Sequence, residues 1–367
     1  LFRPQLDWDQ WRWGLKFLAQ CNDTAYERNV QQIVALGAYS HAALKDLVAS
    51  TGIEYNRLER GIAHFYTDQK SFDAAGHAVE LMRKFGVQRR LVSRDELLKI
   101  EPAFKAYGDK ITGGTYTSTD ESGDARVFTQ ELARRCAARG AQFLYGHDVL
   151  RLNKIGDAID SVAVIARNTG AGGQKDFILK ADAFVVACGS YSAPLLRTVG
   201  VDLPIYPGKG YSATFPLLKP EGAPMVSTID DGKKIAMSRL GNVLRVAGTI
   251  ELGGFDMSLD SPVARARCHM LSRRIAEILP GVCDTRTPEE GGNPQYWTGL
   301  RPATPTNIPF IGQTHLGKLW VNAGHGTLGW THGAGSGKAM AELLSGEVPA
   351  MNFGFLGVQA PRAVRGT

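Results

Sequence analysis

The sequence has few cysteines, and they show no pattern. None of the five forms a C-x-x-C pair, which disfavours zinc and iron–sulfur centres built on neighbouring thiolates. An odd number of cysteines without a pairing pattern predicts reduced, mostly buried thiols in a reducing compartment. The five positions are Cys21, Cys136, Cys188, Cys268 and Cys283.

Long apolar runs and dense clusters of one charge are also missing. No run of about 18 apolar residues occurs, so no segment is expected to span a membrane. The 42 basic and 36 acidic residues leave a net charge of only +6, spread along the chain. Such a mild surplus argues against a nucleic-acid-binding protein and suggests at most a weak attraction to anionic lipid. The 367 residues, 44% of them hydrophobic, predict a globular protein of about two domains.

The most informative stretch lies between residues 296 and 330. It contains a short apolar strand at 319–322 and then a glycine-rich turn, Gly324-His325-Gly326, which leads into a predicted helix at 332–344. Backbone N–H groups and the positive end of the helix dipole meet at such a turn, and glycine lets a ligand approach the backbone closely. The turn suits a phosphate, a carboxylate or the electron-rich end of a flavin ring. A tight turn without a ligand explains the glycines equally well.

Arg301 stands in the same stretch, between Leu300 and Pro302. Its planar guanidinium is the preferred partner of a carboxylate, and Pro302 and Pro305 would make the segment rigid. Arg301 is therefore a candidate carboxylate clamp. The alternative is a surface arginine in a proline-rich loop.

The first 50 residues are predicted to form two helices, the second over residues 24–50. In the first helix, Trp8, Trp11, Leu15 and Leu18 recur at spacings of three and four, as one face of an amphipathic helix requires. We expect this face to pack in the core, with a membrane or partner surface as the alternative.

Several local signals fix elements in the middle of the chain. Ser93, with Glu96 three residues later, forms the capping box of a helix that ends before Pro102. Residues 142–145 are predicted to form a strand, followed by a meander with a glycine turn at 170–173. Strands at 212–215, 234–238 and 243–247 alternate with turns, which is typical of an antiparallel sheet.

Three groups of segments together resemble one family. They are WTGLRPATP, IPFIG and LWVNAGHGTLGW near the C-terminus, ITGGTYTSTDESGDARVFTQELA and YPGKGYSATFP in the middle, and WRWGLKFLAQCN near the start. In this order the chain resembles the FAD-dependent D-amino-acid oxidase/dehydrogenase superfamily, and within it the bacterial D-amino-acid dehydrogenases. The resemblance covers nearly the whole chain.

The resemblance implies an α/β (α+β) fold. An FAD-binding Rossmann-like domain would be built from residues 118–200 and 299–367, and a substrate domain from 1–117, which includes the N-terminal helices, and from the antiparallel sheet of 201–298. Family members begin with a strand, a G-x-G-x-x-G turn and a helix that hold the FAD diphosphate, and no such motif stands near Leu1. The first βαβ unit is therefore expected in a preceding segment or a partner chain, which would complete the FAD site.

The resemblance also implies residue roles. Arg301 would bind the substrate carboxylate. Tyr211 would contact the substrate from a strand on which Lys209 shares its face, because side chains alternate with a period of two; the alternative places both outside the site. FAD would be bound by Val149, Ala187, Gly189, Gly324, His325, Gly326, Thr327, Leu328, Gly329 and Trp330. The N–H groups of residues 326–329 would stabilise negative charge on the reduced flavin, and no metal is expected.

The implied reaction is the oxidative deamination of D-amino acids such as D-alanine to 2-oxo acids and ammonia, with electrons passed to a quinone or another respiratory-chain acceptor. One alternative is a related flavin amine oxidoreductase acting on glycine, sarcosine or an opine. The other is a non-catalytic fragment or subunit without its own grip on FAD. The expected location is the cytoplasm, or the inner face of the bacterial cytoplasmic membrane as a peripheral protein.

Overall fold

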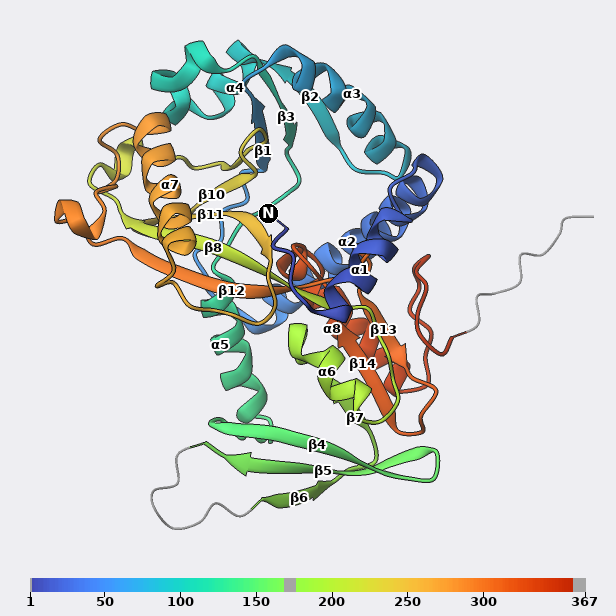
Figure 1. Cartoon of the computed structure of the whole chain (residues 1–367). Helices are drawn as coiled ribbons and strands as arrows, with labels where there is room; N and C mark the ends of the chain where they lie inside the picture. Colours follow the sequence, from blue (N-terminus) through green and yellow to red (C-terminus); the bar gives the residue numbers. More distant parts are fainter. Residues whose placement is uncertain (1, 168–175, 359–367) are drawn as a thin grey trace, which may run out of the picture. The chain divides into compact units, whose positions relative to one another are not determined.

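The computed structural model describes residues 2–167 and 176–358, and its chain divides into two compact units. Unit 1 consists of Leu1–Arg3, Ile53–Leu132 and Lys209–Leu300, and unit 2 of Pro4–Gly52, Ala133–Gly208 and Arg301–Thr367 (Figure 1). Residues 1–117 were expected to lie in one domain, whereas residues 4–52 belong to unit 2. The reason is a long-range contact that a local pattern does not reveal, the packing of helix α2 (Asp23–Thr51) on helix α8 (Gly329–Leu344).

Unit 1 is built on an eight-stranded mixed sheet. Strand β1 pairs in parallel with β9 and antiparallel with β3, while β10 pairs antiparallel with both β9 and β11. In spatial order the strands are β12 (Gln295–Ala303), β8 (Tyr206–Pro216), β11 (Val243–Leu252), β10 (Ile235–Leu240), β9 (Ser227–Asp230), β1 (Ile62–Tyr66), β3 (Gly113–Thr117) and β2 (Arg89–Ser93).

Side chains alternate between the two faces of this sheet. Tyr211 and Phe215 of β8 and Leu244 of β11 belong to the core of unit 1, together with Leu271 of helix α7 (Pro262–Ile278). Helix α7 therefore covers the core face, as Figure 1 shows. The intervening residues, such as Arg245, lie on the opposite face, which we call the polar face.

The remaining helices of unit 1 follow local signals. Ser93 caps α4 as predicted, because its hydroxyl accepts a hydrogen bond from the Glu96 N–H at 3.2 Å. Helix α4 ends before Pro102, where a 3₁₀ segment begins. The elements are α3 (Gln69–Lys84), α4 (Arg94–Ile100), η1 (Pro102–Lys110), η3 (Pro220–Gly222), η4 (Pro288–Glu290) and α5 (Ala125–Ala137), whose last five residues belong to unit 2.

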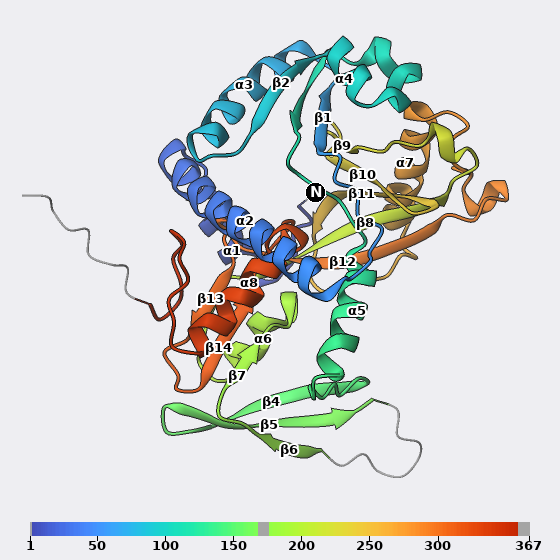
Figure 2. The ribbon, with the colours of Figure 1, turned by 180° about the vertical axis from the view of Figure 1, so that it is seen from behind.

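Unit 2 contains two three-stranded sheets. In the first, β14 (Leu319–Ala323) lies between β13 (Phe310–Gln313), its antiparallel partner, and β7 (Phe184–Val186), its parallel partner. The second consists of β4 (His147–Ile155), β5 (Ala158–Ala166) and β6 (Phe177–Lys180). Helices α1 (Trp8–Leu18), α2, α6 (Ser192–Arg197) and α8, with the 3₁₀ turn η2 (Gly189–Tyr191), complete the unit, and α2 and α8 lie side by side (Figure 2).

Two local predictions from the sequence need correction. Residues 142–145 are exposed and form no strand, because Phe143 and Tyr145 stack on each other, with ring centroids 5.5 Å apart, outside any sheet. All five cysteines are free as expected, but only Cys268 and Cys283 are buried. The predicted glycine turn at 170–173 lies outside the described residues.

The orientation of α1 also differs from the prediction. Trp8, Trp11, Leu15 and Leu18 are 75%, 47%, 66% and 66% exposed, so the expected core face points to solvent. The helix is held by its other side, where Trp13 is buried and donates from its ring nitrogen to the carbonyl of residue 303 at 2.9 Å. Both sides of α1 are apolar, so its period could not show which side would be buried. Across the described ranges of the chain, no helix is both long enough and apolar enough to cross a bilayer.

Candidate functional site

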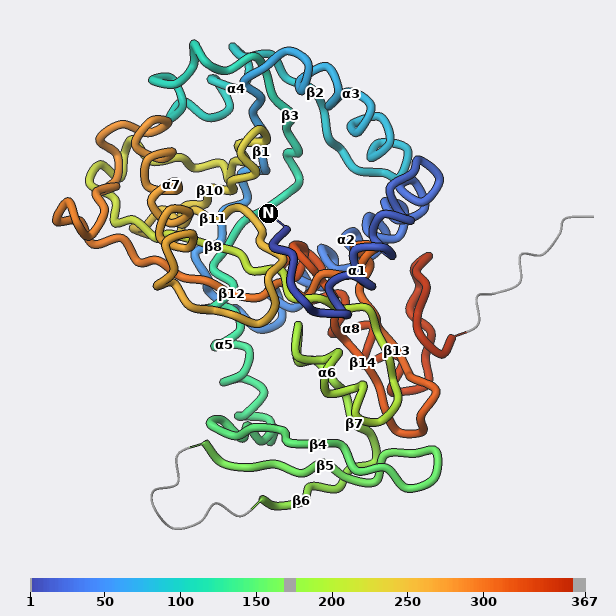
Figure 3. The backbone as a smooth tube through the Cα atoms, in the orientation of Figure 1, coloured from blue at the N-terminus to red at the C-terminus, as the bar shows by residue number. Residues whose placement is uncertain are grey.

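The glycine-rich turn joins strand β14 to helix α8 in unit 2, and Figure 3 traces this path. Gly324 and Gly326 have φ angles of 92° and 54°, a left-handed region that favours glycine. A Cβ atom at Gly324 would lie 2.7 Å from the Thr304 side chain, so the turn packs there without room for a larger residue. At Gly326 a Cβ would meet nothing within 4 Å, so this side of the turn is open.

A second turn lies at the same edge of the sheet. Strands β7 and β14 are parallel, with Val186 opposite Val321, so Ala187 and Gly189 follow β7 beside the glycine-rich turn that follows β14. Ligands of α/β proteins bind at the carboxyl ends of parallel strands. The structure thus brings together the predicted residues 187, 189 and 324–330. Val149 instead lies on β4 in the other sheet of unit 2, where it pairs with Val164 and is 46% exposed.

Backbone donors at this turn divide into two groups. Gly326 N–H donates to the Pro302 carbonyl at 2.9 Å, and Leu328 N–H donates to the His325 carbonyl at 2.9 Å. These two donors close the turn, which limits the predicted set of 326–329. The N–H groups of Thr327 and Gly329 have no acceptor within the described part of the chain, and no side chain caps the start of α8. They remain available for an electron-rich ligand.

A cavity of about 280 Å³ opens at the same place. Asn322 donates its side-chain amide to the Ser336 carbonyl at 3.3 Å, while its buried Oδ1 has no partner in the described residues. Buried polar atoms in proteins are normally hydrogen-bonded, so this oxygen points to a missing donor. The lining consists of Pro302, Asn322, His325, Gly326, Gly329, Gly333 and Ser336.

Two histidines lie on this part of unit 2. The ring of His325 is 2.8 Å from the Ser336 hydroxyl, and burial, aided by His332, lowers the pKa of His325 to about 4. Burial likewise lowers the pKa of His332 to about 4, although the Ile33 backbone acts weakly in the other direction. Neither ring nitrogen of His332 has a hydrogen-bond partner of good geometry among the described residues. Both imidazoles are therefore neutral at pH 7, and the turn offers N–H dipoles rather than a fixed charge.

Arg301 lies near the end of β12, in a segment held at two points. The carbonyl of Pro302 accepts the Gly326 N–H at 2.9 Å, and that of Ala303 accepts the Trp13 ring N–H at 2.9 Å. These bonds fix the residues after Arg301 against the glycine-rich turn. Burial lowers the pKa of the Arg301 guanidinium, yet an arginine stays charged in proteins. Arg301 is therefore a half-buried cation next to a wall of the cavity.

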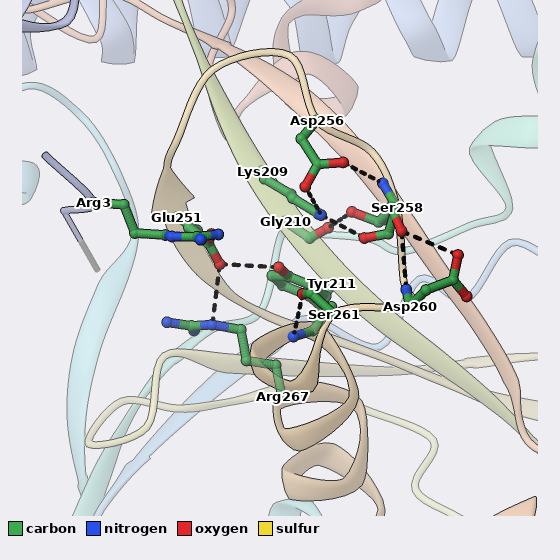
Figure 4. Close-up of polar contacts among 12 residues, drawn as sticks. Arg3, Lys209, Gly210, Tyr211, Glu251, Asp256, Ser258, Asp260, Ser261 and Arg267 are labelled. Atoms are coloured by element: carbon green, nitrogen blue, oxygen red, sulfur yellow. Dashed lines mark hydrogen bonds and ion pairs between the residues drawn. The ribbon is translucent and has the colours of Figure 1, made fainter. Parts of the chain in front are cut away.

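Tyr211 occupies a position that corrects the prediction of a substrate contact. It is 2% exposed in the core of unit 1, and its hydroxyl donates to Glu251 Oε2 at 3.0 Å (Figure 4). Lys209 shares its face, as the period of two predicts, and is likewise buried, with its amine donating to the Ser258 carbonyl at 2.6 Å. The period of two correctly predicted that Lys209 and Tyr211 share a face of the sheet. That face is the core face covered by α7, not the polar face.

Glu251 is the centre of this buried group. Arg3 donates to Oε1 at 2.7 Å, and the Arg267 Nε lies 3.5 Å from Oε2 as an ion pair without hydrogen-bond geometry. Burial acts to raise the pKa of Glu251, but the bonds from Arg3 and Tyr211 hold it below its ordinary value. Burial and the Glu251 carboxylate raise the pKa of Tyr211. Tyr211 is therefore a neutral donor within the core.

Two polar residues of the sheets, Asn322 and Arg245, were not singled out from the sequence. Asn322 fits the alternation of buried and half-buried residues along β14, so nothing in the sequence indicated its role. Its buried Oδ1, which has no partner among the described residues, is what distinguishes it. Arg245 stands within the apolar run of β11, and a charged residue between two core positions was a signal that could have been read.

Comparisons with known proteins agree on one family. The model of the family described as FAD dependent oxidoreductase matches residues 2–343. D-amino acid dehydrogenase of Dechloromonas aromatica is 46% identical over 97% of this chain and 82% of its own length, and that of Methylobacterium radiotolerans is 39% identical over 94% and 78%.

Solved structures show the same fold at lower identity. Glycine oxidase of Geobacillus kaustophilus has a TM-score of 0.72 at 23% identity, over 88% of this chain and 81% of its own. L-proline dehydrogenase of P. horikoshii has a TM-score of 0.71 at 18% identity, over 87% and 80%. The predicted α/β fold with a Rossmann-like part is confirmed.

Proposed function

The chain belongs to the family of FAD-dependent oxidoreductases, and we propose that it catalyses the oxidative deamination of D-amino acids to 2-oxo acids and ammonia. The observation that carries this conclusion is the identity of 46% with a D-amino acid dehydrogenase over 97% of the chain. FAD, when bound, accepts the two electrons and the hydrogen that leave the substrate Cα.

The residues at the sheet edge in unit 2 fit this cofactor. The space at Gly326 is open. The N–H groups of Thr327 and Gly329 and the Oδ1 of Asn322 have no partner among residues 2–167 and 176–358, so they provide both donors and an acceptor. We assign Ala187, Gly189 and residues 324–330 to FAD binding, with Val149 as a further contact from β4. The two N–H groups would stabilise negative charge in the manner of an oxyanion hole.

Arg301 would bind the substrate carboxylate. A half-buried guanidinium gains most from a bidentate anion, because burial has already removed part of its hydration. The substrate amine must be neutral when the Cα hydrogen leaves, since an ammonium withdraws electron density. His325 lines the cavity but is neutral at pH 7, so it brings no charge to the substrate, and we assign the amine proton to solvent.

The decisive experiment measures turnover of D-alanine by the FAD-loaded protein with a dye acceptor, using L-alanine, glycine and sarcosine as comparison substrates. The proposal expects D-alanine to be oxidised and L-alanine to be inert. Arg301→Lys keeps the charge but loses the bidentate fork, so kcat/KM should fall about 10- to 100-fold. Arg239→Lys is the matched control, because Arg239 donates to the Pro220 and Gly241 carbonyls in unit 1. Preferential oxidation of glycine or sarcosine would replace the proposed substrate, and an unchanged kcat/KM in Arg301→Lys would refute the role of this arginine.

A dehydrogenase needs an electron acceptor, and we propose a membrane quinone reached by peripheral docking through α1. The exposed indoles of Trp8 and Trp11 suit the interface of a bilayer, and Lys16 lies on the flank of the same helix. An apolar patch of this kind on a protein surface marks an interaction site.

Co-sedimentation with phosphatidylglycerol vesicles tests this docking. The double variant Trp8→Ser/Trp11→Ser should lose most of the bound fraction, whereas Leu218→Ser, which removes a 61%-exposed leucine in unit 1, should not. Equal binding of the double variant and the parent protein would exclude α1 as the docking surface.

A further inference from the structure

Unit 2 contains a second cavity, of about 390 Å³, at the junction of helices α1 and α2 with the segment 305–307. Its volume is within the range of about 300–1,000 Å³ that small-molecule sites occupy. It shares no lining residue with the cavity at the glycine-rich turn, and all of its lining belongs to unit 2. The residues that decide its chemistry are Phe17, Tyr26, Asn29, Val30, Ile33 and Pro305.

The lining of this second cavity is largely apolar. Phe17, Val30 and Ile33 provide hydrocarbon surface, and none of the described residues that line the cavity is a lysine or an arginine. Asp23 brings a negative charge to the lining, and its carboxylate would repel an anion. The cavity therefore suits neither a substrate carboxylate nor a phosphate, and it favours an uncharged ligand with a large apolar surface.

A hydrogen-bond donor is placed within this apolar lining. Asn29 is only 7% exposed, and its Oδ1 accepts a long hydrogen bond of 3.5 Å from the Arg28 guanidinium. Because arginine can only donate, this contact identifies the oxygen of the amide. The Nδ2 of Asn29 has no acceptor among residues 2–167 and 176–358, yet it keeps some contact with solvent. Shielded polar groups normally have a partner, so a ligand with a carbonyl oxygen would satisfy this donor.

Phe17 forms an aromatic wall that is held in place. Its ring stacks on Trp13, with centroids 5.3 Å apart and an angle of 7° between the planes. The Trp13 indole is fixed in turn by its 2.9 Å hydrogen bond to the Ala303 carbonyl. A ring that is already positioned loses little freedom when a planar ligand binds, and aromatic rings attract one another in offset stacks. The second cavity thus offers a fixed ring surface and an amide donor.

One short segment connects the second cavity with the turn assigned to the flavin. Pro302 lines the cavity at the glycine-rich turn, and Pro305 lines the second cavity. Between them, Thr304 packs on Gly324, where a Cβ atom would lie 2.7 Å from the threonine side chain. The two ends of the stretch 302–305 therefore line the two cavities, and a ligand in the second cavity would lie next to the flavin site.

We propose that the second cavity binds the ring of the quinone that accepts the electrons of the reaction. A quinone is uncharged and planar, and its carbonyl oxygens accept hydrogen bonds of the kind that Asn29 can donate. Phe17 is 38% exposed, so the cavity opens on α1, the helix of the proposed membrane-docking surface. This inference rests on the proposed function for the source of the electrons.

The electron transfer balances without a further reactant. A D-amino acid that becomes an imino acid releases two electrons and two protons. A quinone takes up two electrons and two protons when it becomes a quinol, and FAD, when bound, carries the electrons between the two sites.

Equilibrium dialysis of the FAD-loaded protein against duroquinone tests this assignment without turnover. Duroquinone is fully substituted, so it does not add to the exposed thiol of Cys21 in the lining. The variants are Asn29→Leu, which removes the amide donor, and Phe17→Ala, which removes the aromatic wall. Gln31→Leu and Leu18→Ala are the matched controls, because each lies on the same helix as the residue it controls and outside the lining.

Asn29→Leu and Phe17→Ala should each weaken duroquinone binding about 2- to 10-fold. The KM for duroquinone in D-alanine oxidation should rise by a similar factor, whereas Gln31→Leu and Leu18→Ala should change neither quantity. Phe17 is partly exposed, so Phe17→Ala tests the cavity even if Asn29→Leu does not fold. Equal duroquinone affinities in the parent protein and the folded lining variants, or no binding by the parent, would overturn the inference.

The dialysis and the kinetics separate this inference from the proposed function. A parent protein that binds duroquinone through the second cavity but oxidises no D-amino acid would refute the proposed substrate and keep the cavity assignment. Oxidation of D-alanine with a dye acceptor by a protein that does not bind duroquinone would refute the cavity assignment alone.

Discussion

Replacement of Tyr211 by phenylalanine tests whether this residue belongs to the core or to the catalytic site. The substitution removes one hydroxyl and keeps the aromatic ring, so the packing against α7 is unchanged. The Glu251 carboxylate, only 2% exposed, then loses one of its donors. We expect a loss of stability and no selective effect on substrate binding.

The size of the loss follows from the partners that remain. A hydrogen bond to a charged group contributes about 1.5–3 kcal/mol. Arg3 still donates to Glu251 at 2.7 Å and Arg267 stays at 3.5 Å, so the carboxylate is not left alone. The expected decrease in the free energy of unfolding is therefore about 1–2 kcal/mol, near the lower end of that range.

Urea denaturation and D-alanine kinetics, normalised to bound flavin, measure the two effects separately. Tyr296→Phe is a matched control, because its hydroxyl pairs at 2.8 Å with the neutral Ser272 and should contribute only about 0.5–1 kcal/mol. A several-fold rise in KM for Tyr211→Phe with unchanged stability would show that its hydroxyl meets the substrate. That result would refute the assignment of Tyr211 to the core.

Three further predictions concern stability. Gly335→Ala places a Cβ 2.6 Å from the α2 backbone and should destabilise the folded protein by about 1–3 kcal/mol. On the same helix, the Cβ of Gly337→Ala meets nothing within 4 Å, so this variant should be neutral or stabilising by up to about 1 kcal/mol. Thermal melts compare the two variants. Arg274→Met leaves Asp230, which is 0% exposed, without its 2.6 Å partner and should cost about 3–5 kcal/mol by urea denaturation, much of it recovered by adding Asp230→Asn. The pKa of His332 is about 4 in the folded state and 6.5 ordinarily, so as the pH falls the unfolded chain takes up the proton first and the free energy of unfolding decreases between pH 6.5 and 4, by up to about 3 kcal/mol. His332→Leu should make the free energy of unfolding less dependent on pH in this range. An equal pH dependence in the variant and the parent protein would refute this prediction.

Local signals explain what the sequence predicted well. Strand β14 and the helix after the glycine turn were predicted because the apolar run, the glycines and the helical period lie within a few residues of one another. Helix α8 begins at Gly329, three residues before the predicted start at His332. The turn geometry at Gly324 and Gly326 follows from the same glycines.

Contacts between distant segments explain what the sequence did not predict. The period of α1 shows a helix but not that Trp13, rather than Trp8, faces the body of the unit. Alternation on β8 placed Lys209 and Tyr211 on one face without showing which face α7 would cover.

The division of the chain has a practical consequence for dissecting the protein. Each unit is assembled from three separate stretches, so the chain passes from one unit to the other five times. No single truncation can isolate either unit, and a cut in any of the three middle connections leaves two fragments that each carry pieces of both. We therefore expect such fragments to hold together after proteolysis and to be recovered as functional pairs by co-expression, rather than behaving as two separable domains.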